Sequence, residues 1–392
     1  MKTRKFSILF ALLISMIETK TFAYDIRVQN ADGVTIFYNY IKDGTELEVT
    51  YGDGYKGDIV IPEQVTFMDR TRKVTSIGEN AFKDKYLVLS IIIPNSVTTI
   101  GENAFNGCIS MESLTVGSGV KSIGMWALHE CTNLKKIIIK DIASWCNIDF
   151  AFAWADFDFQ MYHLYSDENT EIRDLIIPEG VISIGKLAFS STDINTVTLP
   201  NSLTKIGRFA FAFCDSLSSV YLPSRLTTIE DNAFYSCYHI RSITIPNSVT
   251  YIGDGAFRGC QGLKTVTIPN AVTYIGERAF DGWDLPTVVS KIEKPFAIVG
   301  KMEYERTFSQ NTFNNATLYV PLGTINAYKT TEGWKDFLFI EEGSPTGINN
   351  IVDKNIKEIK RYTIDGKIIN SPQKGINIIQ MEDGTIQKRI IK

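Results

Sequence analysis

The sequence predicts a mainly β solenoid, in which repeats of one short structural unit stack along a single axis. Three observations predict this fold. The phrase Ile-Gly-x-x-Ala-Phe has eight copies at near-constant spacing, two of them with one residue changed. A β-like run and a proline precede most copies, and the chain is 44% hydrophobic and 21% charged. That balance is typical of a globular protein and excludes collagen-like, low-complexity and disordered chains.

Residues 1–23, the first element of the chain, have the pattern of a secretory signal peptide. Lys2, Arg4 and Lys5 form a positive region, an apolar run over residues 6–17 follows it, and small residues lie around a cut after Ala23. A mainly apolar run of twelve residues is too short to span a bilayer comfortably, which favours a cleaved signal over the alternative of an uncleaved anchor. No later apolar stretch approaches membrane-spanning length, so we expect no transmembrane helix in the mature chain.

The repeats predict a solenoid over residues 58–285. The eight copies of the phrase are separated by 23, 23, 61, 22, 23, 23 and 23 residues. One unit cannot bury its apolar positions alone, so stacked units bury them as columns of like side chains. With strands ~4.8 Å apart, roughly ten units make a body on the order of 50 Å long. The residues predicted to form the columns are Ile77, Phe82, Ile100, Phe105, Cys108, Ile184, Phe189, Ile206, Phe211, Cys214, Ile229, Phe234, Cys237, Ile252, Phe257, Cys260, Ile275 and Phe280.

A glycine follows the isoleucine in seven of the eight copies, and a proline precedes the isoleucine by six residues in six of them. The glycine after the isoleucine is predicted to occupy a place that a Cβ would hinder. The proline six residues before the isoleucine lacks an N–H donor and marks where strand pairing stops.

The unit resembles a known family. The phrase Ile-Pro-Asn-Ser-Val-Thr-x-Ile-Gly-x-x-Ala-Phe-x-x-Cys, nearly complete over residues 245–260, is similar to the BspA-type leucine-rich repeat of bacterial surface proteins. The resemblance is strong over residues 58–285. It implies a right-handed leucine-rich-repeat stack with short helical or 3-10 turns, secretion, and adhesion to host proteins or other microbes.

Six cysteines raise the question of disulfides. Five of them, Cys108, Cys131, Cys214, Cys237 and Cys260, follow the Phe of their repeat (Leu128 in one case) by three residues. An even number in a secreted chain is typical of a disulfide framework. However, side chains on adjacent units point in parallel, which favours buried thiols over bridges. Cys146 lies outside this ladder, and no cysteine or histidine has the spacing of a metal site, so we expect no metal and no cofactor.

The 61-residue step contains an insertion over residues 140–170. It is rich in aromatic residues interleaved with aspartates, and insertions in solenoids often carry binding. The alternative is a satellite core under a long loop. A similar segment, Ser144-Trp145-Cys146 followed by His163-Leu164-Tyr165, is frequent in the family, which favours structure. The candidate aromatic residues are Trp145, Phe150, Trp154, Phe157 and Tyr162.

The strands of the solenoid are predicted to present a hydroxyl-rich face. Residues that alternate with the buried ones point to the open side. Such Ser and Thr pairs stabilise a sheet, and a broad polar face is also what repeat proteins use for binding, so the sequence leaves both roles open. The candidate binding residues are Ser113, Thr115, Thr196, Thr198, Ser219, Tyr221, Ser242, Thr244, Thr265 and Thr267.

The two ends are predicted to cover the solenoid. Residues 24–57 are expected to form an N-terminal β cap and residues 286–342 a C-terminal cap, followed by a linker over 343–347. Residues 348–392 are predicted to form a small β tail, with Asp365-Gly366 as a tight hairpin. This tail resembles the sorting domains of the Bacteroidetes type IX secretion route, the alternative being a plain β domain that stays attached.

Together these features predict a secreted or cell-surface protein and not an enzyme. No nucleophile elbow, zinc-protease, P-loop or dinucleotide motif is present. The net charge of −4 and the lack of a basic stripe exclude nucleic acid as an expected partner. The predicted function is to present a face that binds an extracellular protein or glycan, in adhesion to host or microbial partners. The alternative is a structural or assembly component of the cell envelope.

Overall fold

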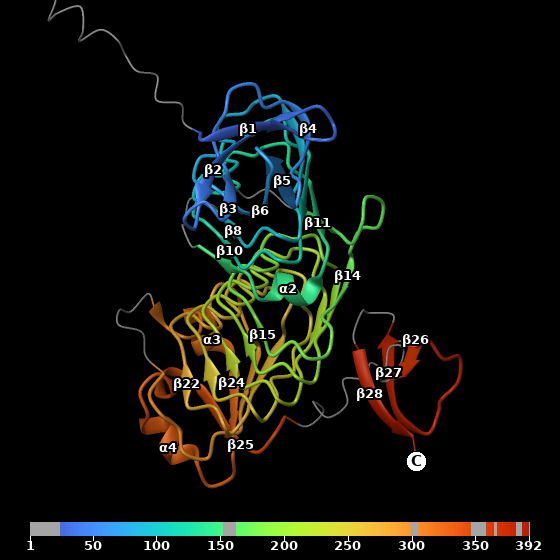
Figure 1. Cartoon of the computed structure of the whole chain (residues 1–392). Helices are drawn as coiled ribbons and strands as arrows, with labels where there is room; N and C mark the ends of the chain where they lie inside the picture. Colours follow the sequence, from blue (N-terminus) through green and yellow to red (C-terminus); the bar gives the residue numbers. More distant parts are fainter. Residues whose placement is uncertain are drawn as a thin grey trace, which may run out of the picture.

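The computed structural model describes residues 24–151, 162–298, 305–345, 358–363, 367–381 and 386–391. The predicted signal peptide lies outside these residues. The model confirms the predicted fold class: the chain forms a β solenoid of about 12 turns, here called coils, with few helices and a small separate sheet at the C-terminal end (Figure 1). Among the described residues, no helix combines the length and apolar character needed to cross a bilayer.

One strand of each coil enters a main sheet, whose strands are parallel because every coil runs the same way round. The main sheet has three parts. The first contains β4 (Gly57–Val60), β7 (Val88–Ile92), β9 (Ser113–Val116), β11 (Lys136–Ile139) and β13 (His163–Tyr165). The second contains β14 (Asp174–Ile176), β16 (Thr196–Thr198) and β18 (Ser219–Tyr221). The third contains β21 (Thr265–Ile268), β23 (Thr287–Ser290), β24 (Thr317–Val320) and β25 (Phe339–Glu342).

A gap in the main sheet corrects one expectation. The run Ser242–Ile245 was expected to be a strand, but no strand is formed there, between β18 and β21. The hydrogen bond from Arg241 N to Ser218 O is long at 3.4 Å. Ile243 and Ile245 are nevertheless buried, so the coil keeps its packing without regular pairing.

A second sheet, in two parts, is built from two-residue strands, and all of them except β12 end at the repeated isoleucine. Its strands are β8 (Thr99–Ile100), β10 (Ser122–Ile123) and β12 (Asp149–Phe150), then β15 (Ser183–Ile184), β17 (Lys205–Ile206), β19 (Thr228–Ile229), β20 (Tyr251–Ile252) and β22 (Tyr274–Ile275). A threonine ladder supports it. The Oγ1 of Thr227 donates to the carbonyl of Thr204 at 3.0 Å, and the Oγ1 of Thr273 donates to that of Thr250 at 3.1 Å.

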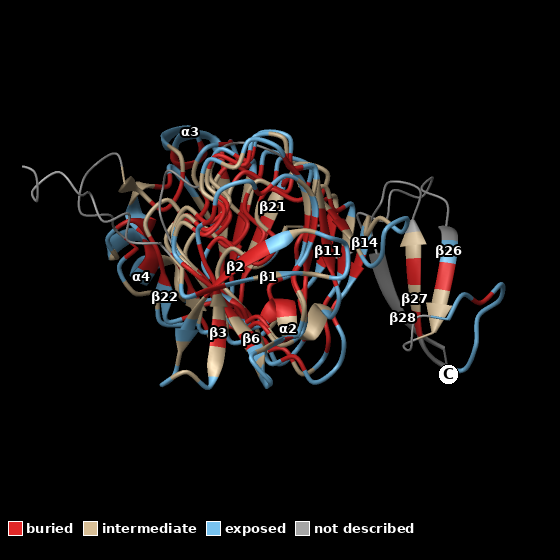
Figure 2. Cartoon of the chain, turned by 45° about the horizontal axis from the view of Figure 1, so that its top comes forward, coloured by how far each residue is buried: buried red, intermediate tan, exposed pale blue. Residues whose placement is uncertain are grey.

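The core consists of the predicted columns. Ile229 lies in register with Ile206 on one side and Ile252 on the other. The rings of Phe211, Phe234 and Phe257 stack with centroids 5.5 Å apart and planes within 6°. All the predicted column residues are buried, and Figure 2 shows this buried interior running through the coils.

The repeated glycine is required by close approach of the neighbouring coil. A Cβ on Gly253 would lie 2.5 Å from the backbone N of Asp231. The left-handed backbone falls elsewhere, on the residue before the repeated alanine, such as Asn80 (φ 56°) or Asn232 (φ 55°). Leu187 (φ 64°) and Phe209 (φ 55°) adopt the same conformation, although asparagine and glycine tolerate it better.

All six cysteines are free thiols buried in the core, and none of them forms a disulfide. In the ladder, each thiol donates to the carbonyl of a Phe from the preceding coil, for example Cys214 to Phe189 at 3.1 Å and Cys260 to Phe234 at 3.2 Å. Cys146 is also fully buried, at the end of helix α2 (Ile142–Cys146). These contacts give the repeated cysteine a structural role.

The buried thiols predict a loss of stability at alkaline pH. Burial raises the pKa of Cys214 from 9.0 to about 11. The unfolded chain therefore releases this proton first, and stability falls between pH 9 and 11 by about 1.4 kcal/mol per pH unit from this thiol. Urea unfolding of the native chain and of Cys214→Ala at pH 7, 9 and 10 measures this. The native chain should lose stability more steeply, and equal slopes would contradict the account.

Both ends of the solenoid are covered. At the N-terminal end, β1 (Ile26–Gln29), β2 (Thr35–Ile41) and β3 (Glu46–Val49) form an antiparallel sheet that joins the second sheet through β6 (Arg70–Ile77), which also pairs with β5 (Gln64–Phe67). At the other end lie α3 (Gln310–Asn315), α4 (Ile325–Thr330) and the 3-10 helix η3 (Trp334–Asp336). There Phe308 stacks on Phe280 at 5.4 Å, and Trp334 and Phe337 pack against Phe308, which closes the Phe column.

The small C-terminal sheet consists of β26 (Glu358–Thr363), β27 (Gly375–Met381) and β28 (Ile386–Ile391), all antiparallel. Its centre is polar as well as apolar. Asn377 is buried, donates to the carbonyl of Gln373 and accepts from its backbone N–H.

Candidate functional site

The outer face of the main sheet carries most of the predicted binding residues. Thr198, Tyr221, Ser242 and Thr244 are exposed, and Tyr221 leaves 47% of its surface open. Partly exposed are Ser113, Thr196, Thr265 and Thr267. The face is therefore open over the second and third parts of the main sheet.

Two predicted residues of this face are buried, which corrects the sequence analysis. Thr115 is 3% exposed and Ser219 is 6% exposed. Alternation along a strand decides which side of the sheet a residue lies on, but burial also depends on what surrounds that side. Thr115 and Ser219 do not present a free surface to a large partner.

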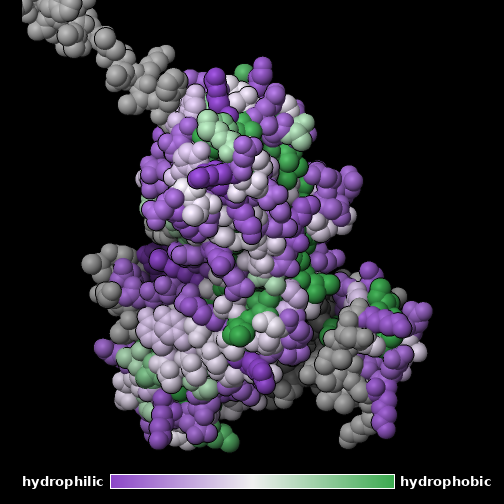
Figure 3. Space-filling view, viewed as in Figure 1, coloured by the Kyte–Doolittle hydropathy of each residue, from purple (hydrophilic) through white to green (hydrophobic). Residues whose placement is uncertain are grey.

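The N-terminal part of the outer face is more apolar than predicted. Val60, Ile92, Thr115 and Ile138 are aligned across β4, β7, β9 and β11, and Val60 and Ile92 remain exposed. In Figure 3, hydrophobic surface recurs along the edge of the body where Figure 1 labels β4 and β11. The hydroxyl residues, from which the face was predicted, do not indicate this column.

A hollow of about 560 Å³ opens where β7, β9 and β11 end. Its lining includes Ile92, Pro94 and Thr115, with Asn95, Ser118, Glu63, Lys140, Asp141 and Ser144 as polar residues. Asn95, Ser118 and Asp141 occupy the same position in three consecutive coils, because they are separated by 23 residues each time. That spacing is the sequence signal that could have identified the hollow.

The insertion shapes one wall of this hollow. Helix α2 begins after Asp141, whose Oδ1 accepts from the backbone N of Ser144 at 2.6 Å. Two hydrogen bonds hold the pKa of Asp141 below its usual range, the larger effect coming from the side chain of Ser144 and the smaller from its backbone. This carboxylate is therefore ionised at neutral pH.

The described aromatic residues of the insertion pack inward. Trp145 is 6% exposed, and its Nε1 donates to the carbonyl of Ala188 at 2.6 Å. Phe150 packs edge-on against Trp145, and Tyr162 is half-buried and bridged to Thr192. These three side chains support the solenoid. Trp154 and Phe157 lie outside the described residues.

A small apolar cavity of about 130 Å³ lies beside these residues. Trp145, Phe150 and Tyr162 line it, together with Leu128 and Leu187. Leu128 stands where other coils have a Phe, so the cavity interrupts the Phe column at the insertion.

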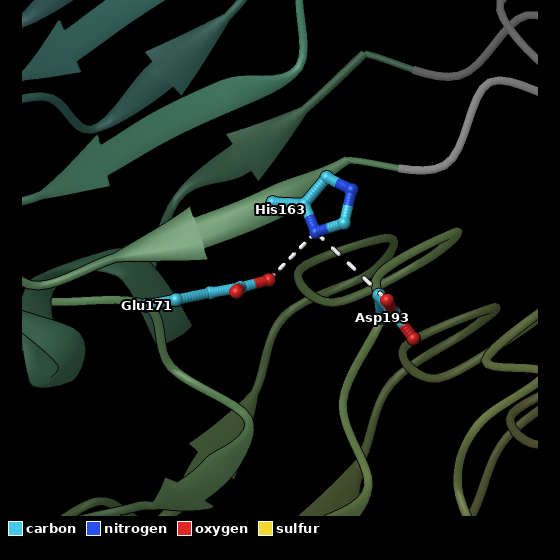
Figure 4. A group of neighbouring side chains, drawn as sticks. All are labelled: His163, Glu171 and Asp193. Carbon is cyan, nitrogen blue, oxygen red and sulfur yellow. Dashed lines mark hydrogen bonds and ion pairs between the residues drawn. The ribbon is translucent and has the colours of Figure 1, made fainter. Parts of the chain in front are cut away.

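A charged cluster holds β13, which lies near the end of the predicted insertion. The Nδ1 of His163 lies 2.6 Å from Oε1 of Glu171 and 3.8 Å from Oδ2 of Asp193 (Figure 4). The guanidinium of Arg173 contacts both acids, with Nε 2.9 Å from Oε1 of Glu171 and Nη1 bonded to Oδ2 of Asp193. The hydroxyl of Ser216, from the next coil, donates to the other oxygen of Asp193.

The donor set of His163, Glu171 and Asp193 resembles a metal site, because their ligand atoms lie within 4.8 Å of one another. Arg173 already provides a cation at the same two carboxylate oxygens. A metal ion would have to displace it, so the cluster is best explained as a clamp between coils. No sequence pattern indicates this cluster, since its members come from three separate segments.

The family model described as "BspA type Leucine rich repeat region" matches residues 63–153 and 163–285 of the sequence, which together exceed half of the chain. The chain belongs to the BspA-type leucine-rich repeat family. The interruption of the match, residues 154–162, falls within the predicted insertion.

Solved structures are similar to this chain over most of its length. A leucine-rich repeat protein from Bacteroides ovatus is 24% identical, with a TM-score of 0.51, and the match covers 82% of this chain and 77% of that one. A leucine-rich cell surface protein from Faecalibacterium prausnitzii is 21% identical, with a TM-score of 0.33 and coverage of 83% and 97%. No curated protein matches the chain.

Proposed function

We propose that this protein is exported and uses the outer face of its main sheet to bind an extracellular protein or glycan. The observation that carries the proposal is the open row of Thr198, Tyr221, Thr244 and Thr267, which no other described element covers completely. A face about 12 coils long, at ~4.8 Å per coil, extends over more than 50 Å. Repeat proteins bind through such extended surfaces.

The properties of this face fit recognition better than catalysis. Hydroxyl groups donate and accept hydrogen bonds, and Tyr221 adds an amphipathic ring of the kind enriched at interfaces. No catalytic family is indicated by the comparisons. Membership of the BspA-type family and the neighbour described as a cell surface protein favour an extracellular or surface location.

Export is part of the proposal. Residues 1–23 supply the proposed signal peptide, and the small C-terminal sheet is the proposed sorting tail. A structural role in the cell envelope is the alternative. Fractionation of cells that express the chain with and without residues 346–392 separates the two, because an envelope component held by its tail would be released by the truncation.

Substitutions on the two sheets test the binding face. Surface plasmon resonance against extracellular-matrix proteins and glycans should reveal a partner with a Kd of micromolar or lower. Thr198→Arg and Thr244→Arg place bulk on the outer face and should weaken binding at least tenfold, equivalent to about 1.4 kcal/mol. Thr228→Arg, on the second sheet, is the matched control. Equal effects of all three substitutions, or no partner at all, would refute the proposal.

A further inference from the structure

We propose that the hollow at the ends of β7, β9 and β11 binds a neutral sugar unit of a glycan. This inference deepens the proposed function, because it assigns one ligand class to one place on the binding face. The hollow has a volume of about 560 Å³, within the range of ~300–1,000 Å³ that is usual for small-ligand sites. It is open to solvent over the strand ends of the main sheet, so a sugar can enter while the rest of its chain stays outside.

The apolar part of the lining, here called the floor, comes from Ile92, Ile93 and Pro94. Ile92 leaves 37% of its surface exposed. Thr115 is almost completely buried by its surroundings and presents only a small surface. Such a floor can pack against the C–H face of a pyranose ring.

The polar residues around the floor are held in place by the fold. The Oδ1 of Asn95 accepts from the backbone N of Ser118 at 2.9 Å and from its hydroxyl at 3.1 Å. Asp141 is fixed in the same way by Ser144 at the start of α2. Fixed donors and acceptors lose little entropy when a ligand binds, which favours recognition of a small polar molecule.

The mixed charge of the lining favours a neutral ligand. Glu63 and Asp141 carry negative charge, and Lys140 carries positive charge. An anionic ligand would meet the two carboxylates, and a cationic one would meet the ammonium group. A polyol satisfies both kinds of group, because each hydroxyl donates one hydrogen bond and accepts others.

A peptide partner is less suited to this place. Extended peptides commonly bind by adding a strand to an open sheet edge. However, β7 is paired with β4 and β9, and β11 is paired with β9 and β13, so none of the three strands offers an edge. The hollow therefore favours a ligand recognised by side chains.

The repeat supplies a matched control for the test. Asn95 lies in the phrase Pro94-Asn95-Ser96-Val97, and the same phrase recurs as Pro246-Asn247-Ser248-Val249. Asn247 is exposed like Asn95, but it does not line the hollow. Asn95→Ala and Asn247→Ala therefore remove the same group from the same repeat position, and only the first alters the hollow.

Saturation-transfer NMR of the full chain tests the proposal with methyl glycosides of glucose, galactose and mannose, with N-acetylglucosamine, and with a sialic acid as the acidic counterpart. We expect at least one neutral sugar to receive saturation. Asn95→Ala should weaken its binding about tenfold, Lys140→Met should weaken it as well, and Asn247→Ala should leave it unchanged. Lys140 is exposed, so its substitution does not threaten folding.

Three outcomes would overturn the inference: no saturation of any neutral sugar, saturation of sialic acid alone, or equal losses in Asn95→Ala and Asn247→Ala. Failure of the wider proposed function has a different signature. Thr198→Arg and Thr244→Arg, which lie outside the hollow, should spare sugar binding and weaken only a macromolecular partner. If the chain still binds a macromolecular partner but binds no sugar, the proposed sugar site is refuted and the proposed binding face is not.

Discussion

Phe234→Ala should lower the free energy of unfolding by about 3–5 kcal/mol, the usual cost of removing a buried phenylalanine ring. Phe234 is fully buried and stacks at 5.5 Å on both Phe211 and Phe257. Its removal leaves a cavity in the middle of the column and also weakens the contacts between three coils. Chemical denaturation followed by circular dichroism measures the loss.

Tyr221→Ala is the control for this prediction. Tyr221 is an aromatic residue with 47% of its surface exposed on the outer face of the main sheet. Its removal should change stability by no more than about 0.5 kcal/mol. Similar losses for Phe234→Ala and Tyr221→Ala would mean that the phenylalanines do not form a continuous buried column.

Gly253→Ala should lower the free energy of unfolding by about 1–3 kcal/mol, because it forces atoms into a filled space. The added Cβ would lie 2.5 Å from the backbone N of Asp231 and 2.6 Å from the carbonyl carbon of Glu230. Neither atom can move without moving the preceding coil. Thermal and chemical denaturation both measure the effect.

Two comparisons limit the loss of stability that is expected for Gly253→Ala. Glu230 occupies the equivalent place one coil earlier, so the contact between coils can open enough for one Cβ, and complete unfolding is not expected. Ser242→Ala, exposed on the same coil as Gly253, should change stability by no more than about 0.5 kcal/mol. If Gly253→Ala leaves the free energy of unfolding unchanged, the coils are packed less closely than they are in the structure.

The buried columns could be predicted from the sequence because a constant period places like residues above one another. Ile229, Phe234 and Cys237 were all assigned correctly in this way, and each is fully buried. The period alone determines these positions, since stacked coils leave one place for each residue of the unit.

Other features depend on neighbours that the period does not define. Thr115 and Ser219 alternate with core residues like the rest of their face, yet both are buried. The clamp joins His163 and Arg173 to Asp193, and these three positions are not related by the repeat period. The hollow combines a periodic set, Asn95, Ser118 and Asp141, with a helix that follows only the last of them.

Hydrogen exchange with mass spectrometry, on the full chain with and without its captured extracellular partner, tests the central claim most directly. The partner is obtained by pull-down with the exported protein. Binding should slow exchange in peptides that contain β9, β11, β16, β18 and β21 of the main sheet, and leave those that contain β17, β19, β20 and β22 unchanged. Protection confined to the second sheet or to the small C-terminal sheet would contradict the claim that the outer face of the main sheet is the binding surface.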